Sequence, residues 1–216
     1  MEEPVILRPR LIVGLGNPGS RYAGTRHNAG FQVIERILAR LATPVRLESW
    51  GEVEFGQVIV AGHEVVLVRP QSYMNVSGPA VVPFLAARGV AADELLVVHD
   101  CLDLPVGRIR LRPAGGSGGQ HGVESLIAAL GSEAFPRLRV GIGHPENADV
   151  VEYVLSDWSA AEQPVMAKVM EMAAEAALFA VEAGIAAAMN RYNGWSALGE
   201  PPRNPNPEET PAREDL

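Results

Sequence analysis

Short apolar segments alternate with helix-forming segments along this chain, and this alternation limits its possible folds more than any other feature. Apolar runs typical of β-strands occur at residues 11–15, 54–60, 64–68, 94–99, 107–112 and 137–142. Apolar residues at helical spacing occur between or after them, at residues 31–41, 78–88, 123–130 and 160–183. The pattern predicts an α/β fold, with a mixed, mostly parallel twisted sheet and helices on both faces.

We expect a single domain over residues 1–195 of this 216-residue chain, because no repeat or linker interrupts that part. A hairpin turn is expected at Ala61-Gly62-His63, between two alternating runs. Residues 196–216 contain five prolines and many charged side chains, which predict a disordered, acidic tail.

Composition excludes several classes of protein. No apolar run approaches the ~18–20 residues that span a bilayer, and the first residues carry acids where a signal peptide is basic. We therefore expect a cytoplasmic protein with no membrane partner. The single cysteine, Cys101, excludes an intramolecular disulfide, and the five histidines lack the spacing of a metal site. The net charge of −8 does not exclude a nucleic-acid partner, because phosphate binding depends on local basic surface.

Polar residues follow four of the predicted strands where each strand ends. These residues are Asn17, Asn75, Asp100 and His144. Ligands of α/β sheets gather beyond the carboxyl ends of the strands, so this convergence predicts a binding site at that edge.

His27 is the candidate general base. It lies just before a predicted helix that Asn28 can cap, and a lone histidine there is more often a polar residue near a helix start. Asp100 changes the interpretation, because an imidazole oriented by a carboxylate can take a proton from water near neutral pH. Neighbouring side chains of a strand face opposite ways, so we expect Asp100 in the cleft and His99 packed away from it.

Alternating arginines mark two strands, at Arg108, Arg110 and Arg112 and again at Arg137 and Arg139. Such spacing puts the side chains on one face of each strand. An ordinary solvated face is one interpretation. A phosphate-binding strip is the other, favoured by the glycine-rich loop that follows.

Two glycine-rich segments resemble known motifs. Residues 14–19 have the glycines of a dinucleotide-binding turn, but no helix opens inside the motif as that function requires. Residues 115–119 match a nucleophile elbow around Ser117, which keeps a serine esterase as an alternative. No aspartate lies between Ser117 and His144, and four flanking glycines suit a loop that approaches a substrate closely.

Taken together, several segments resemble the bacterial peptidyl-tRNA hydrolase family. They are residues 11–19 (LIVGLGNPG), Tyr22, 25–31 (TRHNAGF), 73–78 (YMNVSG), 99–100 with 102–105 (HD and LDLP), 115–119 (GGSGG) and 137–145 (RLRVGIGHP). The resemblance covers residues 10–193, approximately. It implies a monomeric enzyme without cofactors that uses water to cleave the ester between a peptide and tRNA.

The resemblance also implies roles for individual residues. His27 would be the general base, and Asp100 would hold and polarise it. Asn17 and Asn75 would bind substrate and stabilise the oxyanion, and Tyr22 and Met74 would line the cleft. Arg110, Arg112 and Arg139 would bind tRNA phosphates.

This chain departs from the family at two positions. The family commonly has His-Asn where this chain has Gln120-His121, so His121 would take over a substrate contact of an asparagine. An acid usually follows Asp100, and here Cys101 does. A non-catalytic RNA-binding relative of this fold remains a second alternative, which the presence of His27, Asp100, Asn17 and Asn75 disfavours.

Overall fold

The computed structural model describes residues 6–145 and 149–199. They form a seven-stranded sheet in the order β2-β3-β4-β1-β5-β7-β6. The strands are β1 (Leu11–Gly14), β2 (Glu48–Trp50), β3 (Val53–Val60), β4 (His63–Pro70), β5 (Leu95–Cys101), β6 (Ile109–Arg112) and β7 (Arg137–Gly141). The four central strands β4, β1, β5 and β7 are parallel, whereas β2, β3 and β6 run antiparallel to their neighbours.

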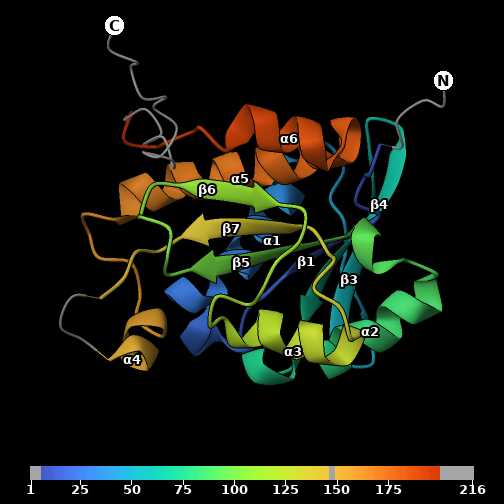
Figure 1. Cartoon of the computed structure of the whole chain (residues 1–216), viewed down its shortest axis with the longest axis horizontal. Coiled ribbons are helices and arrows are strands. Elements are labelled where there is room, and N and C mark those ends of the chain that lie inside the picture. The colour runs from blue at the N-terminus through green and yellow to red at the C-terminus, as the bar shows by residue number, and fades with distance from the viewer. Residues whose placement is uncertain (1–5, 146–148, 200–216) are drawn as a thin grey trace, which may run out of the picture.

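Helices cover both faces of this sheet (Figure 1). The helices α1 (Ala29–Arg40), α5 (Gln163–Ala183) and α6 (Ile185–Tyr192) pack on one face, and α2 (Ser77–Arg88) and α3 (His121–Leu130) on the other. The alternation of strand side chains creates two cores: in β1, Ile12 packs on the α1 side, while Leu11 and Val13 pack on the α2 side.

Short elements complete the chain. A five-residue helix, α4 (Val150–Val154), lies apart from the other helices (Figure 1). Single 3-10 turns are η1 (Ser20–Tyr22), η2 (Arg26–Asn28), η3 (Met74–Val76) and η4 (Ala92–Glu94). No helix of the described residues combines the length and apolarity needed to cross a membrane.

The structure confirms the predicted α/β class and the mixed sheet covered on both faces. The predicted hairpin turn is present, with positive φ at Ala61 (50°) and Gly62 (84°), as a two-residue type I′ turn requires. Sequence patterns missed β2 and α4, because three and five residues are too short to establish a period.

The predicted tail begins at residue 196, and its part from residue 200 onward lies outside the described residues. The residues just before that point still pair with the domain. Ser196 forms an isolated bridge with Arg108, and the Ala197 amide donates to the Gly107 carbonyl at 2.9 Å. Ordered contacts therefore continue past the predicted boundary.

Candidate active site

A histidine–carboxylate pair lies at the carboxyl end of the parallel strands. His27 is in η2, and Asp100 is near the end of β5. His27 Nδ1 is 2.9 Å from Asp100 Oδ2, and both residues are buried, at 8% and 3% exposed. Because the carboxylate occupies Nδ1, Nε2 is the ring nitrogen left to act on a ligand.

Close packing of α1 against the sheet brings η2 to this position. A Cβ on Gly30 would lie 2.3 Å from the Leu15 amide nitrogen and 2.4 Å from the Val98 carbonyl oxygen. Only glycine allows this approach, which places His27, three residues earlier, beside the end of β5.

His99 lines the cleft together with Asp100, although side-chain alternation predicted that only Asp100 would face it. His99 Nδ1 is 2.6 Å from the Asp100 carbonyl oxygen, and within the described part of the chain its buried Nε2 has no hydrogen-bond partner. Burial lowers the pKa of His99 to about 4, and the nearby Arg137 and Arg139 add to this effect while Asp100 opposes it. His99 is therefore a neutral, packed histidine, although part of it lines the cleft.

Asn17 is held with its amide in one orientation. Its Oδ1 accepts a hydrogen bond from the Met74 backbone amide at 2.8 Å, so its Nδ2 is left as a donor. Its backbone is held by Asn28, whose side chain accepts from the Asn17 amide and donates to the Asn17 carbonyl, both at 2.9 Å. Asn28 precedes α1, but its side chain serves Asn17 and makes no capping bond, which corrects the sequence-based expectation.

A cleft of about 360 Å³ brings most of the predicted site residues together. Asn17, His27, Met74, Asn75, Asp100 and His121 all line it. Asn75 and His121 are exposed and also line a second, shallower groove between η3 and α3. Tyr22 is not among the residues that line this cleft: its hydroxyl contacts Arg21, and the tyrosine in the lining is Tyr73.

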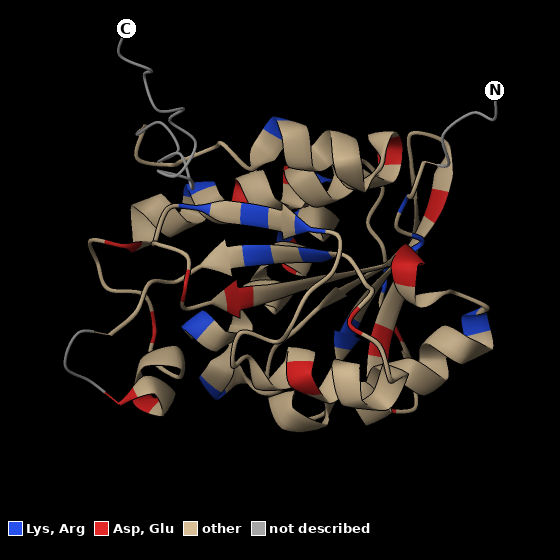
Figure 2. Ribbon diagram, in the orientation of Figure 1, with Lys and Arg blue, Asp and Glu red and all other residues tan. Residues whose placement is uncertain are grey.

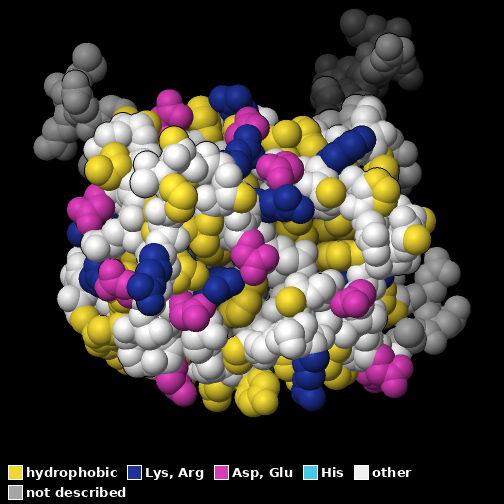
Figure 3. Space-filling model, turned by 180° about the vertical axis from the view of Figure 1, so that it is seen from behind, with side chains coloured by type: hydrophobic (Ala, Val, Ile, Leu, Met, Phe, Trp, Pro, Cys, Tyr) yellow, Lys and Arg dark blue, Asp and Glu magenta, His cyan; other side chains and the backbone are white. Residues whose placement is uncertain are grey.

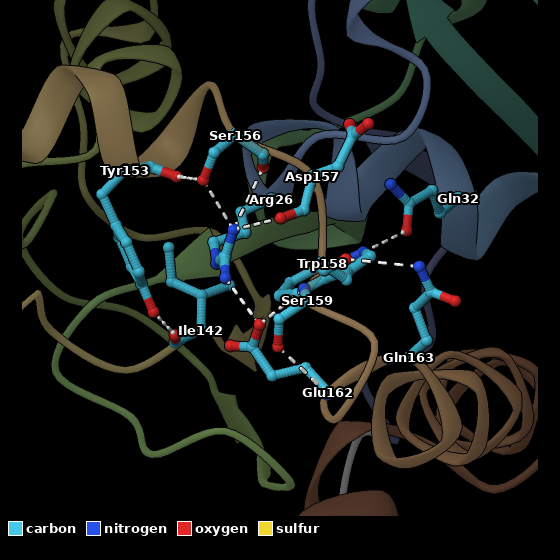
Figure 4. A network of polar contacts seen from close by, with 10 residues as sticks. All are labelled: Arg26, Gln32, Ile142, Tyr153, Ser156, Asp157, Trp158, Ser159, Glu162 and Gln163. Carbon is cyan, nitrogen blue, oxygen red and sulfur yellow. Dashed lines mark hydrogen bonds and ion pairs between the residues drawn. The ribbon is translucent and has the colours of Figure 1, made fainter.

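The short helix α4 forms an apolar wall of the cleft, with lining residues Val150, Val151, Val154 and Leu155. Arg26, the neighbour of His27, anchors the segment that follows α4 (Figure 4). Its buried guanidinium donates, at 2.6–3.2 Å, to the carbonyl and hydroxyl oxygens of Ser156, the Asp157 carbonyl and the Glu162 carboxylate. The 3-10 turn η2 therefore contains both the candidate base, His27, and Arg26, which fixes the segment after α4.

Aromatic rings also contact the buried Arg26 guanidinium, whose Nε has no hydrogen-bond partner among the described residues. Its Cζ lies 4.4 Å from the centre of the Tyr153 ring and 5.1 Å from that of Trp158. Burial would raise the pKa of Glu162, but hydrogen bonds from Ser159 and Arg26 outweigh burial and lower it. The ion pair is therefore charged near neutral pH.

Arginines line the neighbouring strands β6 and β7, whose ribbons carry adjacent blue segments (Figure 2). The strand register sets Arg110 opposite Arg139 and Arg112 opposite Arg137. Directly opposed like charges destabilise a sheet unless an anion or another partner compensates. Burial lowers the pKa of Arg110, and Arg112 and Arg139 lower it further, which shows how closely these cations gather.

Another pocket connects three of these arginines with the glycine-rich loop. Arg112, Arg137 and Arg139 line it with residues 114–118, and Ser117 and Gly118 separate it from the cleft of His27. Arg139 also donates to Cys101 Sγ at 2.9 Å and pairs with Asp103 at 3.1 Å. On the opposite side of the molecule, basic and acidic side chains are interspersed (Figure 3).

Ser117 lacks the surroundings of a catalytic serine. Its Oγ accepts a hydrogen bond from the Gly119 amide at 3.3 Å, and no described contact joins it to a histidine. The loop follows β6, an antiparallel edge strand, whereas a nucleophile elbow ends a central parallel strand. His144, a predicted strand-end residue, is not among the residues that line the cleft, and its Nδ1 is 3.4 Å from the Pro145 carbonyl oxygen. The same residues contain no cluster of three metal-binding side chains.

Sequence reasoning missed the contributions of Gln120, Asn28, Arg26 and α4. Asp149 could have indicated α4, because its carboxylate caps the helix by accepting from the Val151 and Glu152 amides. The partners of Gln120 and Arg26 lie 20 and more than 100 residues away in the chain. No local pattern predicts such contacts.

The fold and the site define an α/β protein with a carboxylate-held histidine in a cleft beside a basic strip. The family model for peptidyl-tRNA hydrolase matches residues 11–200. The chain belongs to the peptidyl-tRNA hydrolase family.

Individual relatives agree with this assignment. A peptidyl-tRNA hydrolase of Synechococcus sp. (strain JA-2-3B'a(2-13)) is 45% identical over 191 residues, covering 88% of this chain and 85% of the relative. That of Shouchella clausii is 44% identical and covers 85% of this chain and all of the relative. The crystal structure of peptidyl-tRNA hydrolase from Acinetobacter baumannii has a TM-score of 0.83 at 36% identity, with 90% of this chain and 100% of that chain covered.

Proposed function

We propose that this protein hydrolyses the ester between the peptide and the tRNA in peptidyl-tRNA. The contact that carries the proposal is the 2.9 Å pair of His27 Nδ1 and Asp100 Oδ2, buried at the base of a cleft. Family membership supplies the substrate class. The cleft, with apolar walls and a few fixed polar groups, suits a peptide attached to a ribose.

His27 is the proposed general base. Its Nε2 takes a proton from a water molecule as the water oxygen attacks the ester carbonyl carbon. The protonated imidazole is stabilised by Asp100 and then gives this proton to the ribose 3′ oxygen as the ester bond breaks. The products are a peptide with a free carboxyl group and a tRNA with a free 3′ hydroxyl.

Asn17 is the proposed oxyanion donor. Its Nδ2 is already directed as a donor, because Oδ1 is occupied by the Met74 amide. A donor fixed before the reaction stabilises developing negative charge without reorganising, and loss of such a donor costs about 10²–10³ in rate. Asn75, Met74 and His121 would contact the peptide and the terminal ribose.

The tRNA is proposed to lie across the glycine-rich loop from His27. The opposed arginines at Arg110–Arg139 and Arg112–Arg137 repel each other, and tRNA phosphates would relieve this repulsion further than the Asp103 carboxylate that pairs with Arg139. Arg137 is mainly structural here, because it is buried and donates to the Gly116 carbonyl at 2.6 Å. Arg110, Arg112 and Arg139 are therefore the proposed phosphate contacts.

We further infer a cytoplasmic monomer that serves translation, with residues 1–195 as the catalytic domain and no metal or organic cofactor. The support is the family assignment and a reaction that needs only water, a base and an oxyanion donor.

The decisive experiment compares His27→Ala with the parent on purified peptidyl-tRNA. We expect turnover to fall by about 10²–10⁴ while tRNA affinity stays near the parent value, because the base acts in the chemical step. His63→Ala is the matched control, since His63 is exposed in the β3–β4 hairpin. A parent that binds tRNA without hydrolysing the ester would instead identify a non-catalytic RNA-binding protein.

His121 has a separate test. A neutral imidazole offers both a hydrogen-bond donor and an acceptor, as an asparagine amide does. A protonated imidazole has lost the acceptor, because both of its ring nitrogens then donate. His121→Asn should keep substantial activity and lose less of it in acid, whereas His121→Ala should raise the Michaelis constant. Equal activity of the three proteins at every pH would mean that His121 makes no substrate contact.

A further inference from the structure

Gln120, the residue before α3, contacts the carboxylate that holds the proposed base. Its Nε2 donates to Asp100 Oδ1 at 3.0 Å, while His27 Nδ1 is 2.9 Å from Oδ2 of the same carboxylate. Gln120 is only 7% exposed, so bulk water does not compete for this bond. Asp100 is thus held from both sides, by η2 and by the start of α3.

The orientation of the Gln120 amide is determined by α3. Its Oε1 accepts a hydrogen bond from the Val123 backbone amide at 2.7 Å and so caps the helix. A flipped amide would direct an N–H group at the Val123 N–H and a carbonyl oxygen at the Asp100 carboxylate, and both contacts would be repulsive. The helix start therefore obliges Nε2 to face Asp100.

We propose that Gln120 is a positioning residue, whose amide holds the Asp100 carboxylate in the rotamer that presents its other oxygen to His27 Nδ1. The inference rests on the proposed role of His27 as the base. The terminal torsion of an aspartate is broad, so one hydrogen bond alone leaves the carboxylate free to turn. A second donor on the other oxygen removes that freedom, and an amide donates at every pH because it does not titrate.

Three variants separate this role from helix capping. Gln120→Ser retains a capping hydroxyl but cannot reach Asp100. Gln120→Glu retains the shape and the capping oxygen but replaces the donor by a second carboxylate. Gln120→His is the rescue variant, because a neutral imidazole offers both a donor and an acceptor. Gln57→Glu, the same substitution at an exposed position of β3, is the matched control.

We expect kcat to fall about 10–100-fold in Gln120→Ser and Gln120→Glu, with KM changed less than about twofold, and to recover in part in Gln120→His. In Gln120→Glu the acid limb of the pH–rate profile should also move up by about one pH unit, because an added carboxylate stabilises the protonated imidazole. Gln57→Glu should match the parent.

Apart from the side chain introduced at position 120, the groups that could contribute to that profile are the same in every variant, and His121 on α3 is one of them. The others are His27 on η2, His99 and Cys101 on β5, Arg139 on β7, and Asp100 itself. A change of profile that follows only the substitution at position 120 therefore reports on its contact with Asp100.

A capping role alone would lower the melting temperature and leave kcat and the pH profile of the folded enzyme at parent values, and that result would overturn the proposal.

An inactive parent would refute the proposed function and not this inference, which has a second readout. The His27 Nδ1 proton should give a downfield NMR resonance in the parent without substrate, and this resonance should broaden or disappear in Gln120→Ser. An unchanged resonance in that variant would refute the positioning role.

Discussion

The burial of His99 predicts how far the free energy of unfolding falls in acid. Burial, with help from Arg137 and Arg139, lowers its pKa from 6.5 to about 4 in the folded protein. Between these two pH values the unfolded chain binds a proton that the folded chain excludes, so the free energy of unfolding must fall as the pH is lowered. At about 1.4 kcal/mol for each pH unit, His99 alone removes about 3 kcal/mol between pH 6.5 and pH 4.

The matched substitution is His99→Asn. Its amide can still donate to the Asp100 carbonyl, as Nδ1 does at 2.6 Å, but it does not titrate. Urea unfolding, followed by circular dichroism at several pH values, gives the free energy of unfolding of both proteins. The variant is expected to be less stable than the parent near neutral pH and to lose about 3 kcal/mol less on acidification.

His63→Asn is the control, because it removes an exposed histidine at the start of β4. Its stability should follow the parent at every pH. If the curves of the parent and His99→Asn are instead parallel within about 0.5 kcal/mol, His99 is not held neutral and the reasoning from burial is wrong.

Three further changes test other parts of the site. Arg26→Lys should lower the free energy of unfolding by about 1.5–3 kcal/mol, because lysine cannot span the acceptors after α4 and the Glu162 carboxylate together; unchanged denaturation would refute this anchor. Ser117→Ala should keep most activity, and stoichiometric acylation of Ser117 with loss of activity would restore the esterase alternative. Replacing Arg110 and Arg112 by alanine should flatten the salt dependence of tRNA binding by about one unit for each lost contact, and an unchanged slope would place the phosphates elsewhere.

Much of the fold follows from local patterns. The apolar run at β1 reflects burial on both faces, and the alternation at β3 reflects partial exposure of one face. In β4, by contrast, Val65–Val68 are buried on both faces, although an alternating pattern was predicted there. The same reasoning placed Asp100 and Asn17 at one edge of the sheet, because parallel strands end on the same side. Tyr22, in η1, is not among the residues that line the cleft, and the path of such a loop depends on tertiary packing that no local pattern predicts.

Local sequence patterns were sufficient to predict the class of fold, the edge of the sheet that carries the site, and the residue types available for chemistry there. These depend on periodicity and side-chain chemistry, which act over a few residues. Only the tertiary structure decided which groups meet. Asn28 supports Asn17 and leaves α1 uncapped, and Gln120 caps α3 and holds Asp100 with the same amide. Such pairings join residues distant in sequence, and they form only where packing buries polar groups that must then find partners.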